Sequence, residues 1–222
     1  MKLKAIFFDV NETLLNLEKL KKSVDSILDT EGASEVWFSS LLHYSLVESI
    51  RGEYHDFTEI AAAVLRMQAA RLSKDLSEDQ IKDALSVVRK LDPYPDVIPA
   101  LKELKKEIKL VAFSNGKPEV LQEQLENAEI ANFFDQVFSV ESCKLYKPHP
   151  ESYQLVLKKL DLSPGEAMMV AAHGWDIAGA QTAGLKTAFV NRPGKSPFPL
   201  APEPDHQLDN LVELIQILKP RS

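Results

Sequence analysis

Residues 7–15 read FFDVNETLL, an apolar run that reaches Asp9 and is followed at once by polar residues. The apolar residues on the N-terminal side of Asp9 predict a buried strand. A carboxylate at the end of such a strand is costly unless it is hydrogen-bonded or has a chemical task. This stretch therefore predicts a strand that delivers an aspartate to a functional site.

Short, continuous apolar runs recur along the chain, as expected for parallel strands that are buried on both faces. Helical patterns separate the later runs, and Pro118 and Pro150 suit the first position of two of these helices. The alternation predicts an α/β fold with a Rossmann-like parallel sheet core and helices on both faces. We expect strands at 3–9, 109–114, 136–140, 167–172 and 186–190.

The segment 16–91 breaks this alternation, because its apolar residues follow helical spacing throughout. A capping box at Ser77 to Gln80 opens one of its helices, and Pro93 and Pro95 form a stiff exit. We expect an inserted all-helical cap that covers the edge where open α/β sheets bind ligands. The predicted domains are a core, 1–15 with 92–222, and a cap, 16–91.

The composition excludes several classes of protein. The chain has 222 residues, 45% of them hydrophobic, which is enough for one core and a smaller second one. A net charge of -7 without a long basic run disfavours a nucleic acid or an anionic membrane as partner. Cys143 is the one cysteine, so a reducing compartment is natural, and the N-terminal apolar run is too short for a membrane span. We expect a soluble, cytoplasmic protein.

Four clusters of polar residues lie where a sheet of this kind binds ligands. They are Asp9 with Asn11, Glu12 and Thr13; Ser114 with Asn115 and Gly116; Lys147, just before the helix that Pro150 opens; and His173 with Trp175 and Asp176. No cluster is specific alone, but the four together in this order are a strong signal.

The set resembles the haloacid dehalogenase-like hydrolase superfamily and, within it, the type II L-2-haloacid dehalogenases, over nearly the whole chain. Asp9 with Thr13 resembles the first motif of that superfamily, in which the aspartate is the nucleophile. The other matching residues are Ser114 and Asn115 for the second motif, Lys147, Pro148 and Tyr153 for the third, Trp175, Asp176, Gly179 and Ala180 for the fourth, and Trp37, Tyr44 and Ser45 in the cap.

The chemistry of that family explains these residue types. An ionised carboxylate such as Asp9 can displace a leaving group and form an ester, which water then hydrolyses. Lys147 would keep the carboxylate charged and orient it. Thr13, Ser114 and Asn115 would donate hydrogen bonds to a substrate carboxylate or a departing anion. Singly, Lys147 reads equally well as a surface lysine and Ser114 to Gly116 as a turn; the joint pattern favours a site.

A magnesium-dependent small-molecule phosphatase is the alternative, because most members of the superfamily are phosphohydrolases. Those enzymes carry an acidic proton donor two residues after the nucleophile, where this chain has Asn11, which cannot serve. They also usually carry a Gly-Asp pair ahead of the later aspartate, where this chain reads Ala171-Ala172-His173-Gly174-Trp175-Asp176. The sequence therefore predicts no metal and no organic cofactor. A relative that binds a carboxylate without turnover is a third interpretation.

One departure from the dehalogenases falls in the cap. Their usual cap arginine, which helps to receive the halide, falls on Phe38. An aromatic edge is weakly positive and contacts an anion less strongly than a guanidinium does. Packing in the cap core is an equally simple role for Phe38.

A second departure concerns the hydrolytic water. Where these dehalogenases usually have a serine and an asparagine on the fourth-motif strand, this chain has Ala171 and His173. An imidazole suits general-base work near neutral pH. Glu12 should lie beside the strand that bears His173, and would fix one ring nitrogen while the other takes a proton from water. The simpler alternative is that His173 caps the next helix and Glu12 is solvated.

These observations predict a hydrolytic dehalogenase that converts short 2-haloacids to 2-hydroxyacids through an Asp9 ester. The resemblance implies that a homodimer would be ordinary. The expected catalytic residues are Asp9, Glu12, Lys147, His173 and Asp176, and the expected substrate contacts are Val10, Asn11, Thr13, Phe38, Ser114, Asn115, Tyr153 and Trp175.

Overall fold

A parallel sheet forms the centre of the computed structural model, which describes residues 2–218. Its strands lie in the order β3-β2-β1-β4-β5-β6, and each neighbouring pair is parallel. The strands are β1 (Ala5–Phe8), β2 (Lys109–Ser114), β3 (Gln136–Ser139), β4 (Ala167–Ala171), β5 (Lys186–Val190) and β6 (His206–Leu208). β1 is therefore central, between β2 and β4, and its carboxyl end lies beside theirs.

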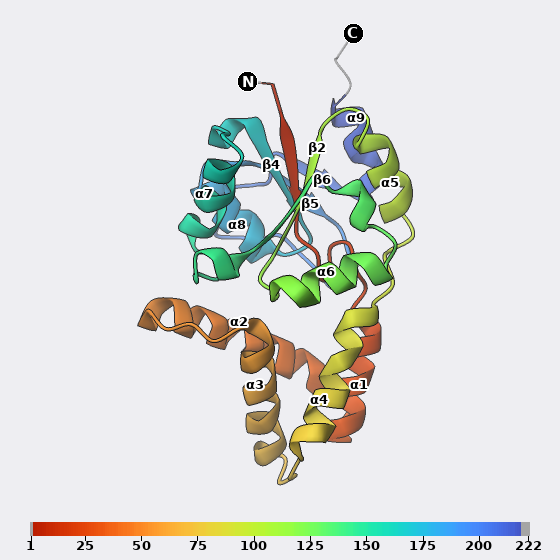
Figure 1. Cartoon of the computed structure of the whole chain (residues 1–222), viewed down its shortest axis with the longest axis vertical. Helices are drawn as coiled ribbons and strands as arrows, with labels where there is room; N and C mark the ends of the chain where they lie inside the picture. The colour runs from red at the N-terminus through yellow and green to blue at the C-terminus, as the bar shows by residue number, and fades with distance from the viewer. Residues whose placement is uncertain (1, 219–222) are drawn as a thin grey trace.

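Helices cover both faces of this sheet, which confirms the predicted α/β fold. Figure 1 shows α7 and α8 on one side of the sheet and α5 and α9 on the other. These helices are α5 (Val97–Leu104), α6 (Pro118–Asn127), α7 (Pro150–Lys159), α8 (Gly174–Thr182) and α9 (Leu214–Leu218). Pro118 and Pro150 occupy the first turns of α6 and α7, as predicted, because proline has no N–H that the helix would need there.

Four further helices lie together beyond the carboxyl ends of the strands (Figure 1). They are α1 (Glu18–Leu28), α2 (Ala33–Arg51), α3 (Phe57–Arg71) and α4 (Glu78–Ser86). The predicted capping box holds the start of α4, where Ser77 and Gln80 satisfy each other's backbone N–H groups. We call these helices the cap helices. One hydrophobic cluster runs through them and the sheet, so the division into two domains stays a prediction.

The two connections between the cap helices and the sheet run side by side. Asn16 donates its N–H to the carbonyl of Asp92 at 2.9 Å, and Tyr94 donates to the carbonyl of Leu14 at 2.9 Å. The entry to the cap helices is therefore paired with their exit, directly after the loop that carries Asp9.

The structure differs from the sequence prediction at the sheet edge and at strand ends. β6 was not predicted, because it has three residues and only Leu208 among them is apolar. The first strand is confined to Ala5–Phe8, whereas the prediction ran from residue 3 to residue 9. Asp9 itself lies just beyond the strand, where its side chain is free to serve a site.

Candidate active site

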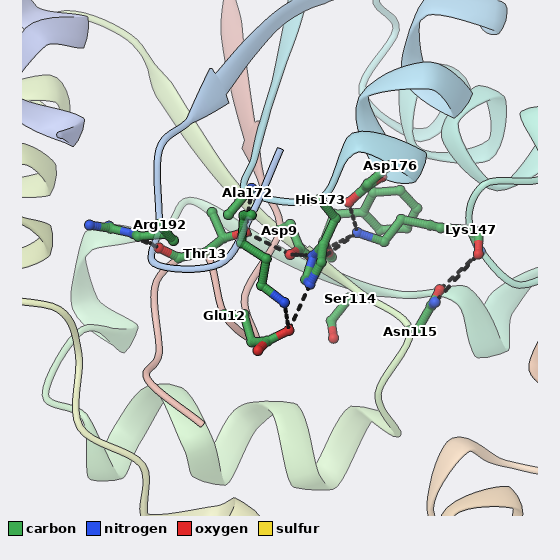
Figure 2. Close-up of polar contacts among 12 residues, drawn as sticks. Asp9, Glu12, Thr13, Ser114, Asn115, Lys147, Ala172, His173, Asp176 and Arg192 are labelled. Atoms are coloured by element: carbon green, nitrogen blue, oxygen red, sulfur yellow. Dashed lines mark hydrogen bonds and ion pairs between the residues drawn. The ribbon is translucent and has the colours of Figure 1, made fainter. Parts of the chain in front are cut away.

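The predicted polar clusters meet at the carboxyl edge of the sheet (Figure 2). Asp9 follows β1, Lys147 precedes α7, and His173 stands between β4 and α8. Parallel strands end at the same edge, which explains how residues so distant in sequence converge there. Asp9 is the centre of this cluster.

The Asp9 carboxylate is buried and held on both oxygens. Lys147 Nζ lies 2.9 Å from Asp9 Oδ1, whereas Thr13 Oγ1 donates to Oδ2 at 2.7 Å. His173 Nδ1 lies 3.1 Å from the same Oδ2. Burial alone would raise the pKa of Asp9, but the Lys147 ammonium and His173 together hold it well below its ordinary value. Asp9 is thus an ionised carboxylate with fixed orientation, as a nucleophile requires.

Lys147 joins two carboxylates and is itself fully buried. Besides Asp9, its ammonium contacts Asp176 Oδ2 at 2.6 Å and the carbonyl of Phe113 at 3.1 Å. Tyr153 donates its hydroxyl to Asp176 Oδ1 at 2.5 Å. Burial lowers the pKa of Lys147, but Asp176 and Asp9 outweigh it and raise that pKa overall. The Lys147 ammonium therefore stays charged, and its charge in turn keeps the Asp9 carboxylate ionised.

His173 and Glu12 also come together, on the other side of Asp9. Glu12 Oε2 lies 3.0 Å from His173 Nε2. The backbone of Glu12 is left-handed, with φ of 60°, which is uncommon for a residue with a side chain. Burial lowers the pKa of His173, but hydrogen bonds to Asp9 and Glu12 outweigh it and raise that pKa.

This geometry differs in one respect from the sequence expectation. The side chain of His173 makes no capping hydrogen bond to α8, and Glu12 is buried, so the capping alternative does not describe the pair. The second ring nitrogen, which the sequence reading left open for water, instead faces Asp9. Since a neutral imidazole carries a single N–H, two carboxylate contacts suit the imidazolium form.

Several expected substrate contacts are engaged with protein groups. Thr13 Oγ1 accepts the Ala172 N–H at 2.9 Å as well as donating to Asp9, so it positions the nucleophile. Asn115 Oδ1 accepts the Lys147 N–H at 2.9 Å and so ties that loop to β2. Asn11 Oδ1 accepts from Gln124 of α6 at 2.9 Å.

The remaining expected contacts are Val10, Ser114, Tyr153, Phe38 and Trp175. Val10 is fully buried, and Tyr153 is committed to Asp176. Ser114 Oγ accepts the Gly116 N–H at 3.0 Å and still carries a proton to donate. Phe38 and Trp175 both stack against His173.

Sequence reasoning missed three cations that hold this edge together. Lys195 Nζ contacts Glu12 Oε2 at 2.5 Å, and Lys21 Nζ of α1 contacts Glu12 Oε1 at 3.0 Å. Arg192 donates two hydrogen bonds to the carbonyl of Thr13, at 3.1 and 2.9 Å. Burial raises the pKa of Glu12, but His173 and Lys195 outweigh it and lower that pKa to about 2. Arg192 and Lys195 follow the carboxyl end of β5. Ligands bind at this end of the strands in open α/β sheets, so the position of these two residues in the sequence could have identified them.

The residues present do not fit a magnesium site. The Lys147 ammonium already lies within hydrogen-bond distance of both Asp9 and Asp176. Among residues 2–218, no three His, Cys, Asp or Glu side chains are grouped so that they could hold a metal ion. Magnesium prefers several oxygen ligands in octahedral geometry, which this arrangement does not offer.

Comparison with known proteins identifies the family of this chain. A sequence model of a hydrolase family, the haloacid dehalogenase-like hydrolases, matches residues 3–184. The chain belongs to this family. Its sheet order and its helical insertion are thus the fold of a haloacid dehalogenase-like hydrolase.

Two relatives of this chain fall in the branch that the sequence resembles. An (S)-2-haloacid dehalogenase of Xanthobacter autotrophicus is 32% identical over 86% of this chain and 76% of that protein. (S)-2-haloacid dehalogenase 4A of Burkholderia cepacia is 32% identical over 97% of this chain and 95% of that protein. The predicted resemblance to L-2-haloacid dehalogenases is confirmed.

Solved structures agree with this placement. The L-2-haloacid dehalogenase from Xanthobacter autotrophicus superposes with a TM-score of 0.92 at 27% identity, covering 99% of this chain and 100% of that one. The same enzyme with chloropropionic acid covalently bound superposes with a TM-score of 0.91. Within residues 2–218, no helix has the length and apolar character needed to cross a membrane.

Proposed function

We propose that this hydrolase cleaves the carbon–halogen bond of short 2-haloacids and releases 2-hydroxyacids through an ester on Asp9. The observation that carries the proposal is the Asp9 carboxylate, which is buried, ionised and hydrogen-bonded on both oxygens. Relatives named (S)-2-haloacid dehalogenases and a related structure with chloropropionic acid covalently bound support it.

In the first step an oxygen of Asp9 attacks C2 of the haloacid, and the halide leaves with the bonding electron pair. Lys147 keeps Asp9 ionised until attack, since its ammonium is only 2.9 Å away. Ser114 retains a hydroxyl proton that suits the substrate carboxylate or the halide. Trp175 stacks on the neighbouring His173 ring.

Ester formation changes the charge that His173 experiences. In the free enzyme its ring lies between two carboxylates, Asp9 and Glu12. An Asp9 ester is neutral, so one of the two interactions that favour the imidazolium is lost while burial remains. The pKa of His173 therefore falls, and its Nδ1 proton is released. The neutral Nδ1 then faces the ester carbonyl, with Glu12 still holding Nε2.

Hydrolysis then closes the cycle with protons balanced. Nδ1 takes a proton from water as the water oxygen bonds to Asp9 Cγ. The tetrahedral intermediate expels the hydroxyacid oxygen, which takes that proton from His173. The carboxylic acid left on Asp9 returns its own proton to Nδ1, restoring the carboxylate and the imidazolium. One haloacid and one water thus yield one hydroxyacid, one halide and one proton.

Halide release separates this proposal from its alternatives. We expect release from chloroacetate, bromoacetate or a 2-halopropionate in the presence of EDTA, and none from Asp9→Asn. A phosphate ester assayed with magnesium tests the phosphatase alternative, and phosphate release without halide release would replace the proposal. Binding of a 2-haloacid without either product would indicate a non-catalytic relative.

The path of the water oxygen tests the ester itself. In oxygen-18 water, a single turnover with enzyme in excess should place the label in Asp9 and not in the hydroxyacid, since water attacks Cγ. Label in the hydroxyacid after that first turnover would mean that water displaces the halide directly. A homodimer and a cytoplasmic location complete the proposal, to be measured by light scattering and by cell fractionation.

A further inference from the structure

Phe38 and His173, which the sequence pattern singled out separately, lie side by side in the structure. Phe38 of α2 stacks on the imidazole of His173, with ring centroids 6.4 Å apart and planes inclined by 30°. Trp175 covers the ring from α8, at 5.0 Å and 25°. His173 is thus held by one aromatic ring from the cap helices and by another from the sheet side.

The hydrogen bonds of His173 fix the positions of its two ring nitrogens more tightly than the tilt of the ring about them. Nδ1 lies 3.1 Å from Asp9 Oδ2, and Nε2 lies 3.0 Å from Glu12 Oε2. A tilt about the line through the two nitrogens would leave both distances nearly unchanged. Such a tilt would turn the Nδ1 lone pair away from a water placed over Asp9. Packing against the ring faces restrains that tilt, and this is what Phe38 supplies from the cap.

The charges around Phe38 favour an aromatic ring in this place. Hydrogen bonds to Asp9 and Glu12 favour the cationic form of His173, and Lys195 Nζ lies 5.9 Å from the centroid of the Phe38 ring. The face of an aromatic ring attracts a nearby cation, more strongly when the site is desolvated. A second guanidinium or ammonium at this position would instead repel both cations. An aromatic residue at 38 and a histidine at 173 therefore suit each other electrostatically.

We infer that Phe38 is a positioning residue through which the cap helices hold the His173 ring in the orientation that activates the hydrolytic water. Phe38 thereby acts on the second half of the reaction, ester hydrolysis, and not on halide departure. This role replaces the sequence expectation that Phe38 contacts the leaving halide. The inference rests on the proposed function, because it assigns Phe38 to the step that His173 serves.

The two half-reactions tell these roles apart. In Phe38→Leu, which keeps an apolar side chain but removes the ring, the halide burst should form at nearly the wild-type rate. Hydrolysis should slow about 10- to 100-fold, the cost of misplacing a catalytic group by a fraction of an ångström to 1 Å. Phe38→Tyr keeps the ring face and should restore hydrolysis. Rapid-quench halide assays and intact-mass detection of the Asp9 ester measure the two steps.

Leu41→Ala is the matched control, since Leu41 is a buried residue of the same helix one turn further on. It should change stability but not the ratio of ester formation to hydrolysis. A Phe38→Leu enzyme that slows the halide burst and hydrolyses the ester normally would overturn the inference in favour of halide binding. Unchanged rates of both steps would overturn it as well.

A spectroscopic measurement keeps the inference testable even if no haloacid is turned over. The ring N–H protons of His173, hydrogen-bonded to Asp9 and Glu12, should give low-field proton NMR signals in the wild type and in Phe38→Tyr. These signals should broaden or vanish in Phe38→Leu but persist in Leu41→Ala. Unchanged signals in Phe38→Leu would show that the ring does not need Phe38. Failure of halide release with a Phe38-dependent signal would instead refute the proposed function alone.

Discussion

The two sides of Asp9 are built differently. On one side, Lys147, Asp176 and Tyr153 are buried and come from α7, from α8 and from the segment that leads into α7. On the other side, His173 and Glu12 depend on Lys21 and Phe38 from the cap helices and on Lys195 from the segment after β5. The first side is held by residues of the core, whereas the second also needs contacts from the cap helices and from the segment after β5.

This difference matches the two halves of the proposed reaction. Attack by Asp9 needs an ionised, oriented carboxylate, which Lys147 maintains whether or not substrate is bound. Hydrolysis needs a base that becomes available only once Asp9 is esterified. His173 must change its protonation state during the cycle. Because Asp9 and Glu12 both contribute to its pKa, loss of the Asp9 charge alone shifts that pKa.

Lys147→Met should have the largest effect on activity and stability, because it removes the ammonium that joins Asp9 and Asp176 on the buried side of the site. Two buried carboxylates would lose the cation between them, and breaking such a pair costs about 3 to 5 kcal/mol in the free energy of unfolding. Halide release should fall by about 10² to 10³, as when a preorganised charged or hydrogen-bonding group is lost. Urea unfolding and a halide assay measure both. Stability within experimental error of the wild type would contradict the account of this side.

Glu12→Gln changes the side of the site that holds His173 and should slow hydrolysis of the ester. Glutamine keeps the shape but not the charge that orients His173, so hydrolysis should slow by up to about a hundredfold. The halide burst should remain near the wild-type rate. Rapid-quench measurement of the burst amplitude checks this, and a proportional loss of both steps would mean that Glu12 serves attack as well.

Glu12→Gln should also change how the stability of the protein depends on pH. The pKa of Glu12 is lowered from 4.5 to about 2, so its contribution to stability is present above pH 4.5 and is lost as the pH falls toward 2. The pKa of His173 is raised above 6.5, so its contribution is present below pH 6.5 and is lost as the pH rises through the folded-state value. Urea midpoints across pH should show a smaller acid decline in Glu12→Gln than in the wild type. Parallel curves would contradict the assigned ion pairs.

Lys195→Met should have the smallest effect, because Lys21 still contacts Glu12. A partly exposed ion pair is worth up to about 1 kcal/mol, so hydrolysis should slow less than about fivefold. Removing Lys21 as well should cost more than the two single changes combined, since each cation now substitutes for the other. A double-mutant cycle on the hydrolysis rate measures this, and strict additivity would mean that the two lysines act independently.

The sequence predicted the core side of the site better than the side that the cap completes. The apolar runs that end at Asp9 and Ser114 located two of the strand ends, and Pro150 marked the helix that follows Lys147. Local spacing carries this information because strands and helices have fixed periods. β6 escaped because its three residues have no apolar pattern.

The contacts of Lys195, Lys21 and Phe38 could not be predicted in the same way. Lys195 is 183 residues from Glu12 in sequence, and a lysine in a proline-rich segment has the composition of a solvated surface. Phe38 lies on a helix. Helical spacing predicts which residues share a face of that helix, but it does not predict which residues of the core lie opposite that face. Only the three-dimensional structure shows that the rings of Phe38 and His173, 135 residues apart in sequence, lie beside each other.

In the proposed mechanism, His173 serves ester hydrolysis and not ester formation. The most direct test is an intact-mass time course of His173→Ala mixed with a 2-bromopropionate. We expect one halide released per active site, a protein heavier by the mass of the propionate group on Asp9, and slow or absent turnover after that. Repeated turnover at the wild-type rate, with no esterified protein detected, would contradict it.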